Sequence, residues 1–430
     1  MGDVEIGAAR CPRLVGRDDE LARLRAAVDE ARYGRGSAVA VIGPPGIGKS
    51  RLIGELSGLG AEVLVGRAVP GAWTAHRPLI EVLATGLRGL PWPNRVTLDP
   101  YRAVLDRLLT AHVSSGESDD RVWVIAETLL RVLRAIRGDD PQVVVLEDLH
   151  WSDPDTLDVV EYVADNLARE RCLLVLTARE EPGPVLVVLD RLARRAAVHT
   201  VRLGALSERS VLEMAAACLG GRPGNAVRDL LHRAHGTPLM IEELLASTDA
   251  GVDVPRTVVE LTMARVRRLS VAARRCVFAA AVLGEGADPA LLRGMLGLPI
   301  EEVGDAVREA AAADLVEVAD ADTVAFRHSL TRDAVLASML PGERAGWATR
   351  ALVVLDDIDA DWRQFGGLAA DLAEVAGDPH RAAALLVRAG RHDASRGALA
   401  TAEAALRRAG ALAEGDARRP PTRTKLSPMS

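Results

Sequence analysis

The stretch "AVAVIGPPGIGKSRLI" (residues 38–53) determines how the rest of the chain is interpreted. Its apolar run Val39–Ile42 predicts a short buried strand, and the glycines and prolines that follow end that strand. Residues Gly43–Ser50 match the pattern G-x-x-x-x-G-K-[ST] in full. Because a helix is expected to begin near Lys49, this loop joins a strand to a helix, and the pattern predicts a phosphate-binding P-loop.

Each part of this loop has a physical role in holding a nucleotide. The glycines let backbone N–H groups converge on an anion, and the helix start adds its positive end. Lys49 is expected to reach the outer phosphates, and Ser50 to present its hydroxyl to Mg²⁺. The expected cofactors are therefore ATP or ADP with Mg²⁺. The predicted cofactor-binding residues of this segment are Gly43, Pro44, Pro45, Gly46, Ile47, Gly48, Lys49, Ser50 and Arg51.

The use of basic residues supports a special role for the loop lysine. Lysine occurs only at Lys49 and Lys425, and arginine is used elsewhere. A coding bias toward arginine accounts for the general pattern. A lysine retained in the loop under that bias indicates a requirement for a compact ammonium, which a planar guanidinium meets poorly.

A pair of acids follows a second apolar strand. The segment "QVVVLEDL" (142–149) reads as a buried strand ending in Glu147 and Asp148. A P-loop site needs an acid at the end of a neighbouring strand to hold the magnesium shell. We expect one of these carboxylates to face the magnesium shell and the other to polarise the attacking water. The alternative is a pair of solvated acids that only end the strand.

The first half of the chain predicts an α/β fold. Apolar strands are expected at residues 61–68 and 172–180, in addition to those described above. They alternate with helical patterns at 14–34, 121–137 and 157–168. Residues 70–120 have no clean period and predict loops and short helices. Continuous apolar strands that alternate with helices predict a doubly wound parallel sheet, as in a P-loop NTPase.

The second half predicts smaller helical domains. Three helical segments and two short strands, 315–319 and 323–327, have the order of a winged helix. Residues 380–414 predict two alanine-rich helices that resemble the start of an α-helical repeat region. The expected division is a P-loop NTPase domain (13–205), a helical lid (206–255), a winged helix (256–345), a TPR-like helical start (346–415) and a disordered tail (416–430).

Composition limits the classes of function. The chain has 430 residues and a formal net charge of −7, which argues against a dominant nucleic-acid surface. No run of about 18 uncharged apolar residues predicts a membrane span. The four cysteines contain no CxxC pair, and the first residues do not look like a signal peptide. These features predict a cytoplasmic protein with reduced thiols.

The predicted winged helix does not read as a DNA-binding module. Its expected recognition helix, residues 299–314, carries five acids against the single Arg308. Phosphate contacts need lysine and arginine, so DNA would repel this helix. The arginines of "LDRLARRAAVHTVRL" (189–203) are more simply a solvated helix face. We therefore expect no direct DNA reader in this chain.

An ordered set of five motifs has a family resemblance. The motifs are "LVGRDDEL", "GPPGIGKS", "VLEDLHWSD", "LTARE" and "GTPLMIEELL". Together they resemble the signal-transducing STAND ATPases of the AAA-like superfamily. Within that class the chain is most similar to the large ATP-binding LuxR-type transcriptional regulators of actinomycetes, which are similar to the maltose-regulon activator. The resemblance covers about residues 13–415.

The resemblance implies further nucleotide contacts. Val15, Gly16 and Arg17 match the entry motif that lies near the base and ribose. Pro238, in the lid motif that begins at Gly236, matches the proline that lies against the adenine. A proline that only starts a helix is the alternative for Pro238.

The resemblance also implies roles near the phosphates. Glu147 matches the metal-shell acid, which is usually Asp, and Asp148 matches the second acid, the catalytic base. The longer Glu leaves the division of labour between the two acids open. Arg179 matches a sensor arginine; because it directly follows a buried strand, it is also expected at the ligand-binding edge of the sheet. His328 matches a winged-helix histidine that senses the bound nucleotide.

These observations favour a nucleotide-controlled switch over a kinase or a motor, since no acceptor motif or ring-assembly element is evident. The resemblance implies a slow ATPase module of a LuxR-type regulator, which binds nucleotide, self-associates on activation and responds to an inducer or protein partner. The alternative is a non-hydrolysing interaction module. The helix-turn-helix that ends full-length relatives is not visible, so a truncated product, a fragment and a natural short form stay open.

Overall fold

The protein is described from a computed structural model. The described residues are 11–69, 75–89, 98–110, 122–136, 141–224, 227–228, 231–248, 258–284, 287–318, 323–357, 362–395 and 397–417. Of the tail predicted to be disordered (416–430), residues 416 and 417 instead belong to the last helix, which runs to Ala417, and residues from 418 onward lie outside the described part. Within this part of the chain, no helix is both long and apolar enough to cross a membrane.

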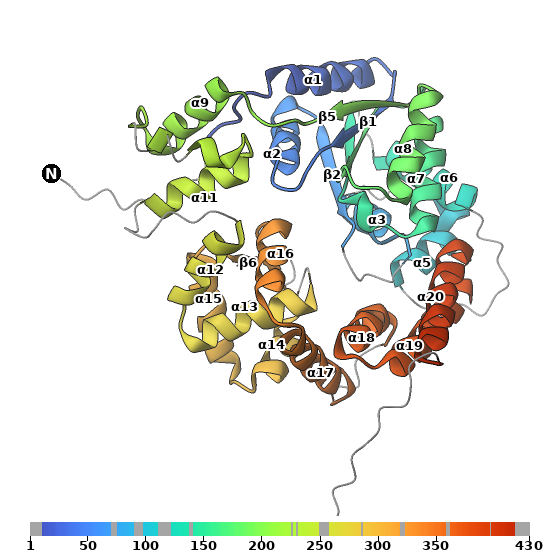
Figure 1. Ribbon diagram of the computed structural model, residues 1–430. Coiled ribbons are helices and arrows are strands. Elements are labelled where there is room, and N and C mark those ends of the chain that lie inside the picture. Colours follow the sequence, from blue (N-terminus) through green and yellow to red (C-terminus); the bar gives the residue numbers. More distant parts are fainter. Residues whose placement is uncertain are drawn as a thin grey trace, which may run out of the picture.

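A parallel sheet of five strands organises the first half (Figure 1), as the sequence predicts. Its order is β2-β3-β4-β1-β5, and every pairing is parallel. β4 therefore lies between β1, which leads into the P-loop, and β3, which ends in the acid pair. The strands are β1 (Ser37–Ile42), β2 (Glu62–Arg67), β3 (Gln142–Glu147), β4 (Cys172–Ala178) and β5 (Val198–Arg202).

The edge strand β5 corrects one prediction. The arginines of residues 189–203 are expected to form a solvated helix face, but the helix α8 ends at Arg194, and Arg202 lies on the strand Val198–Arg202, which pairs with β1. Val198 and Val201 are buried while His199 and Arg202 are exposed. One buried face over so few residues gives too weak an alternation to reveal an edge strand.

Helices cover both faces of the sheet because the strands are apolar on both. In β1, Ala38, Ala40 and Ile42 pack into one core, and Val39 and Val41 into the other. Successive side chains of a strand point to opposite faces, so a continuous apolar run needs a cover on each side. α1 (Asp18–Arg32) and α2 (Lys49–Gly54) cover one face. The other face is covered by α3 (Arg77–Gly89), α5 (Arg102–Thr110), α6 (Val122–Ile136), α7 (Pro154–Asp165) and α8 (Pro184–Arg194).

The remaining described elements are mainly helical. α9 (Glu208–Leu219) and α11 (Pro238–Thr248) follow the sheet. The antiparallel pair β6 (Val316–Val318) and β7 (Val324–Phe326) comes after three helices, as predicted. The other helices are α12 (Val258–Arg268), α13 (Val271–Leu283), α14 (Pro289–Leu296), α15 (Ile300–Ala312), α16 (Ser329–Ser338), α17 (Pro341–Asp357), α18 (Trp362–Ala376), α19 (Pro379–Ser395) and α20 (Leu399–Ala417).

The predicted boundary at residue 345 falls inside α17, so the structure does not divide there. Trp347, Ala348 and Leu352 of α17 share one core with α13, α14 and α15. That core continues through Leu372 of α18 to Ala382 of α19. The predicted winged helix (256–345) and the predicted TPR-like helical start (346–415) are therefore joined by one continuous core.

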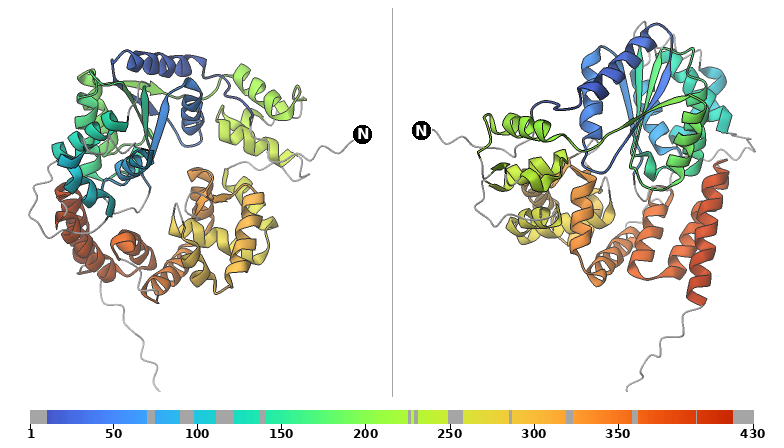
Figure 2. Two further views of the ribbon diagram at one scale, coloured as in Figure 1. Left: turned by 180° about the vertical axis from the view of Figure 1, so that it is seen from behind. Right: turned by 45° about the horizontal axis from the view of Figure 1, so that its top comes forward.

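The chain then returns to the sheet domain and closes a ring of elements (Figure 1; Figure 2). The contact is polar: the buried carboxylate of Asp155, near the start of α7, accepts from Thr401 N at 2.6 Å and Ala400 N at 3.4 Å. These N–H groups belong to the first turn of α20, where a helix leaves its donors unpaired. Asp153, which caps α7, also accepts from Thr401 Oγ1 at 3.1 Å.

We predict that Asp155→Asn loosens the docking of α20. The amide keeps the shape but loses the charge, and charge-assisted hydrogen bonds are about twice as strong as neutral ones. Amide hydrogen exchange in the first two turns of α20 should accelerate roughly tenfold, which corresponds to about 1.4 kcal/mol. The matched control is Asp158→Asn, an exposed carboxylate of the same helix. Equal exchange in both variants would show that this contact does not hold the helix.

Candidate functional site

The P-loop adopts the backbone that its glycines permit. Gly46 and Gly48 have φ of 74° and 99°, in the region that favours glycine, and Gly48 is the N-cap of α2. A Cβ on Gly46 would lie 3.1 Å from the Cβ of Leu239, so α11 packs directly on the loop. Lys49 Nζ donates to the carbonyls of Gly43 at 2.8 Å and Pro44 at 3.0 Å. The loop therefore forms a cradle with an ammonium at its mouth.

A cavity of about 540 Å³ opens at this edge of the sheet, a suitable size for a nucleotide. Its lining includes apolar side chains, among them Val15, Met214 and Pro238, and charged ones, among them Lys49 and Asp148. Of the predicted residues, those that line it are Val15, Arg17, Pro45, Gly46, Ile47, Gly48, Lys49, Ser50, Arg51, Asp148, Arg179, Pro238 and His328. Gly16, Gly43, Pro44 and Glu147 are not in the lining.

Arg17 ties the entry motif to the P-loop. Its side chain is 6% exposed, and Nη2 donates to Ile47 O at 3.2 Å and Gly204 O at 2.6 Å. Nη1 also approaches Glu20 at 3.4 Å. The guanidinium thus holds the loop against the segment that leaves β5. This geometry gives Arg17 a part in shaping the cavity, in addition to the nucleotide contact that the resemblance implies.

The two acids at the end of β3 are placed differently. Glu147 is 5% exposed, and its Oε2 accepts from Arg67 Nε at 3.0 Å and Nη2 at 2.6 Å. Asp148 has a left-handed backbone, with φ of 55°, and its N–H donates to Thr177 Oγ1 at 2.8 Å. The assignment of Glu147 to the metal shell stays a prediction, and the geometry favours Asp148 as the acid that faces the cavity.

Electrostatics around the acid pair follow from burial. Burial raises the pKa of Asp148 above its ordinary value, and the neighbouring Glu147 raises it further, against the opposing charges of Arg67, Lys49 and Arg179. Burial also lowers the pKa of Lys49, which Asp148 partly offsets. Burial thus disfavours the charged forms of both Lys49 and Asp148 in the free site. A ligand that brings a phosphate for the lysine and a metal ion for the carboxylate would stabilise both charges.

Arg179 connects the sheet to the second half of the chain. It follows β4 and is 8% exposed. Its Nη2 lies 3.4 Å from Oδ2 of Asp333 on α16, and its Nη1 lies 3.8 Å from Glu181 Oε1. Its guanidinium also lies over the ring of Trp151, 5.7 Å from the ring centroid. An arginine at the ligand edge is therefore paired with a residue 154 positions later.

The lid motif lies beside the P-loop, and the adenine contact expected for Pro238 stays a prediction. Pro238 begins α11, its Cγ lies 3.8 Å from the position of a Cβ on Gly48, and Leu239 N donates to Gly46 O at 3.2 Å. The predicted site residues do not include Arg67 and Met214, which line the cavity, or Asp333, which pairs with Arg179. Arg67 could have been found by the argument used for Arg179, because each is a basic residue at the carboxyl end of a parallel strand.

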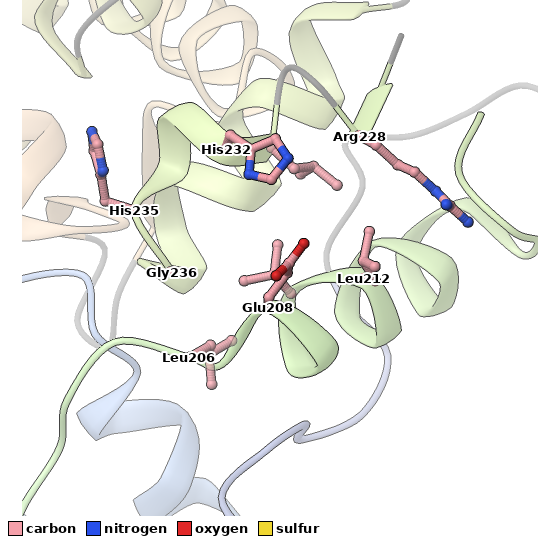
Figure 3. A pocket seen from close by; sticks show the side chains of 9 residues that line it. Leu206, Glu208, Leu212, Arg228, His232, His235 and Gly236 are labelled. Atoms are coloured by element: carbon pink, nitrogen blue, oxygen red, sulfur yellow. The ribbon is translucent and has the colours of Figure 1, made fainter. Parts of the chain in front are cut away.

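A second cavity, of about 470 Å³, lies within the lid (Figure 3). It is lined by Leu206, Glu208, Val211, Leu212, Arg228, Leu231, His232, His235 and Gly236. These residues include none of the P-loop and neither acid of β3. The cavity at the P-loop is therefore the candidate site, since it unites the motif with charged side chains from several elements.

Comparison with known structures supports the fold. A STAND protein with a tetratricopeptide repeat sensor, from Pyrococcus horikoshii, matches with a TM-score of 0.53 and 15% identity over 95% of this chain and 60% of that chain. Cdc6p from Pyrobaculum aerophilum matches with a TM-score of 0.39 and 13% identity over 79% and 98%. The likeness to the STAND protein shows a shared fold.

Sequence comparison adds a domain assignment. Residues 13–176 match the family profile described as the AAA ATPase domain. This segment is therefore similar to AAA ATPase domains. An uncharacterized protein of Rhizobium meliloti (strain 1021) is 28% identical over 458 residues, which cover 94% of this chain and 43% of that protein. The chain thus spans less than half the length of this curated relative.

We predict that Asp148→Asn stabilises the free protein in a pH-dependent way. Because the pKa of Asp148 is raised by folding, its ionisation costs stability above the ordinary carboxyl value of about 3.9. The melting temperature of the variant should exceed that of the parent at pH 7.5, and the gain should shrink toward pH 4. The exposed Asp19→Asn is the control. A gain that is constant with pH would contradict the electrostatic explanation.

Proposed function

We propose that the protein is an ATP-binding switch that hydrolyses ATP slowly. The observation that carries the proposal is the cavity that the P-loop and Arg179 line together. Arg179 also forms an ion pair with Asp333, which lies in the second half of the chain. A group that touches both the phosphate region and another part of the chain can convert the state of a nucleotide into a change of arrangement.

The chain's own residues suit ATP or ADP. The apolar lining residues Val15, Met214 and Pro238 fit a base, and Lys49 with the N–H groups of the loop fits the phosphates. Ser50 and Asp148 line the same cavity and offer oxygen ligands of the kind that Mg²⁺ prefers. When bound, Mg²⁺ would neutralise charge on the outer phosphates.

Slow hydrolysis fits the state of the acid pair. Polarising a water needs a carboxylate with a free acceptor near the terminal phosphate. Asp148 lines the cavity, whereas Glu147 is held by Arg67. Of the two acids at the end of β3, only Asp148 lines the cavity, so the metal shell and the attacking water compete for it. A non-hydrolysing interaction module remains the second candidate for the same reason.

Switching would depend on competition for Arg179. A terminal phosphate in the cavity would attract the guanidinium away from Asp333, because a phosphate carries more charge than a carboxylate. A ligand shifts an equilibrium only through unequal affinity for its two states. Arg179 supplies that inequality between ATP and ADP, and His328, which also lines the cavity, is the second candidate. In this proposal the winged helix, residues 256–345, closes over the nucleotide, as a second cover besides the helical lid, and does not read DNA.

The wider role is proposed from the sequence motifs. They favour the regulatory ATPase module of a LuxR-type regulator that self-associates and responds to an inducer or protein partner. The likeness of fold to a STAND protein is compatible with this role. The acidic surface of α15, with Glu301, Glu302 and Asp305, argues against direct DNA contact by that helix.

We predict that Lys49→Ala loses most of its affinity for ATP. Removing a charge-assisted contact of about 1.5–3 kcal/mol should weaken binding roughly 10- to 150-fold. Calorimetric titration with magnesium ATP measures the change, and the exposed Arg23→Ala is the control for loss of a positive charge. Equal affinities for Lys49→Ala and the parent would refute the nucleotide site.

We further predict that Asp333→Asn weakens the link between Arg179 and α16. Exchange of α16 amides should differ between the ADP complex and a complex with a non-hydrolysable ATP analogue in the parent. In the variant the difference should become smaller. Glu181→Gln is the matched control, because Glu181 also approaches Arg179 but lies in the same domain. Identical exchange in both parent complexes would reject the switch.

A further inference from the structure

The last residue of β2, Arg67, is paired across the sheet with the last residue of β3. Arg67 and Glu147 are register partners, and two nitrogens of the guanidinium bind one carboxylate oxygen. The Arg67 side chain is 48% exposed and lines the nucleotide cavity, whereas Glu147 is buried and does not. The arginine therefore stands between the carboxylate and the cavity.

Local packing fixes this arginine in place. A Cβ on Gly66 would lie 1.9 Å from Pro78 O, so the end of β2 touches the backbone at the start of α3. Arg67 N donates to Glu81 Oε2 at 2.8 Å, and Arg77 Nε donates to the other oxygen of Glu81 at 3.2 Å. The backbone that carries Arg67 is thus held by α3, independently of the nucleotide.

The following acid is turned the other way. Asp148 has a positive φ, which interrupts the extended backbone of β3, and Thr177 of the adjacent strand accepts its N–H. The Asp148 side chain lines the cavity and interacts electrostatically with Lys49. A non-glycine residue with this backbone is strained and persists where its surroundings fix it. The two adjacent acids consequently face different partners.

We propose that Arg67 is a positioning residue that withdraws Glu147 from the cavity and leaves Asp148 to orient the magnesium shell. This inference rests on the proposed nucleotide site and departs from the roles that the family resemblance implies for the two acids. It gives the slow turnover a cause, since the carboxylate next to the metal acid is engaged by an arginine. If so, releasing Glu147 from Arg67 should restore part of the metal affinity that the Asp148→Asn variant loses.

Metal affinity tests this proposal without relying on hydrolysis. Mn²⁺ is titrated into the protein saturated with a non-hydrolysable ATP analogue and followed by electron paramagnetic resonance. Asp148→Asn should lower the Mn²⁺ affinity roughly 10- to 100-fold, the usual range for loss of a partner that orients metal ligands. Glu147→Gln should change it by less than about threefold, well below that range.

The double variant isolates Arg67. Arg67→Gln added to Asp148→Asn removes the guanidinium that binds the buried Glu147 carboxylate, which leaves this carboxylate available to the metal, and should recover part of the lost affinity. Arg77→Gln in the same background is the matched control, because Arg77 binds Glu81 and not Glu147. Recovery with Arg67→Gln alone supports the positioning role, and recovery with neither variant or with both overturns it.

Failure of this inference can be distinguished from failure of the proposed nucleotide site. If Glu147→Gln abolishes Mn²⁺ binding and Asp148→Asn does not, the nucleotide site stands and the inference is overturned. If the parent protein binds the ATP analogue neither with nor without metal, the proposed function fails and the inference fails with it. Circular dichroism of each variant shows whether a loss reflects unfolding.

Discussion

The position of β4 between β1 and β3 is the constraint on which the site depends. Carboxyl ends of parallel strands meet at one edge of the sheet, where doubly wound folds bind ligands. The P-loop after β1, Arg179 after β4 and Asp148 after β3 are therefore neighbours, although they come from distant parts of the sequence. The hydrogen bond from Asp148 to Thr177 fixes the central part of this edge.

Two of the polar contacts that connect the sheet domain to later parts of the chain carry a buried charge. Arg179 meets Asp333 at the cavity, and Asp155 holds the start of α20 on the far side of the ring of elements. Asp155 lies seven positions after Asp148, and Arg179 directly follows β4. Each contact is therefore made by a segment that leaves the ligand edge of the sheet. Burying a charge is costly unless it is paired, which makes such contacts sensitive to competition and better suited to switching than apolar packing.

The sequence predicted the parts of this arrangement that depend on local pattern. The P-loop, the strands that end near Ile42, Glu147 and Ala178, and the order of helices and strands from α13 to β7 follow from apolar runs and glycine chemistry. The short edge strand β5 and the continuity of α17 did not, because pairing and core packing determine them. The Arg67–Glu147 and Arg179–Asp333 pairs join residues 80 and 154 positions apart, and no local pattern encodes such partners.

The central claim is that the chain changes arrangement with its nucleotide. Small-angle X-ray scattering of the protein, loaded in turn with ADP and with a non-hydrolysable ATP analogue, tests this claim most directly. The account predicts two distinct distance distributions, because only the analogue brings a terminal phosphate to compete with Asp333 for Arg179. Superimposable distributions, with each nucleotide bound at one per chain, would contradict it.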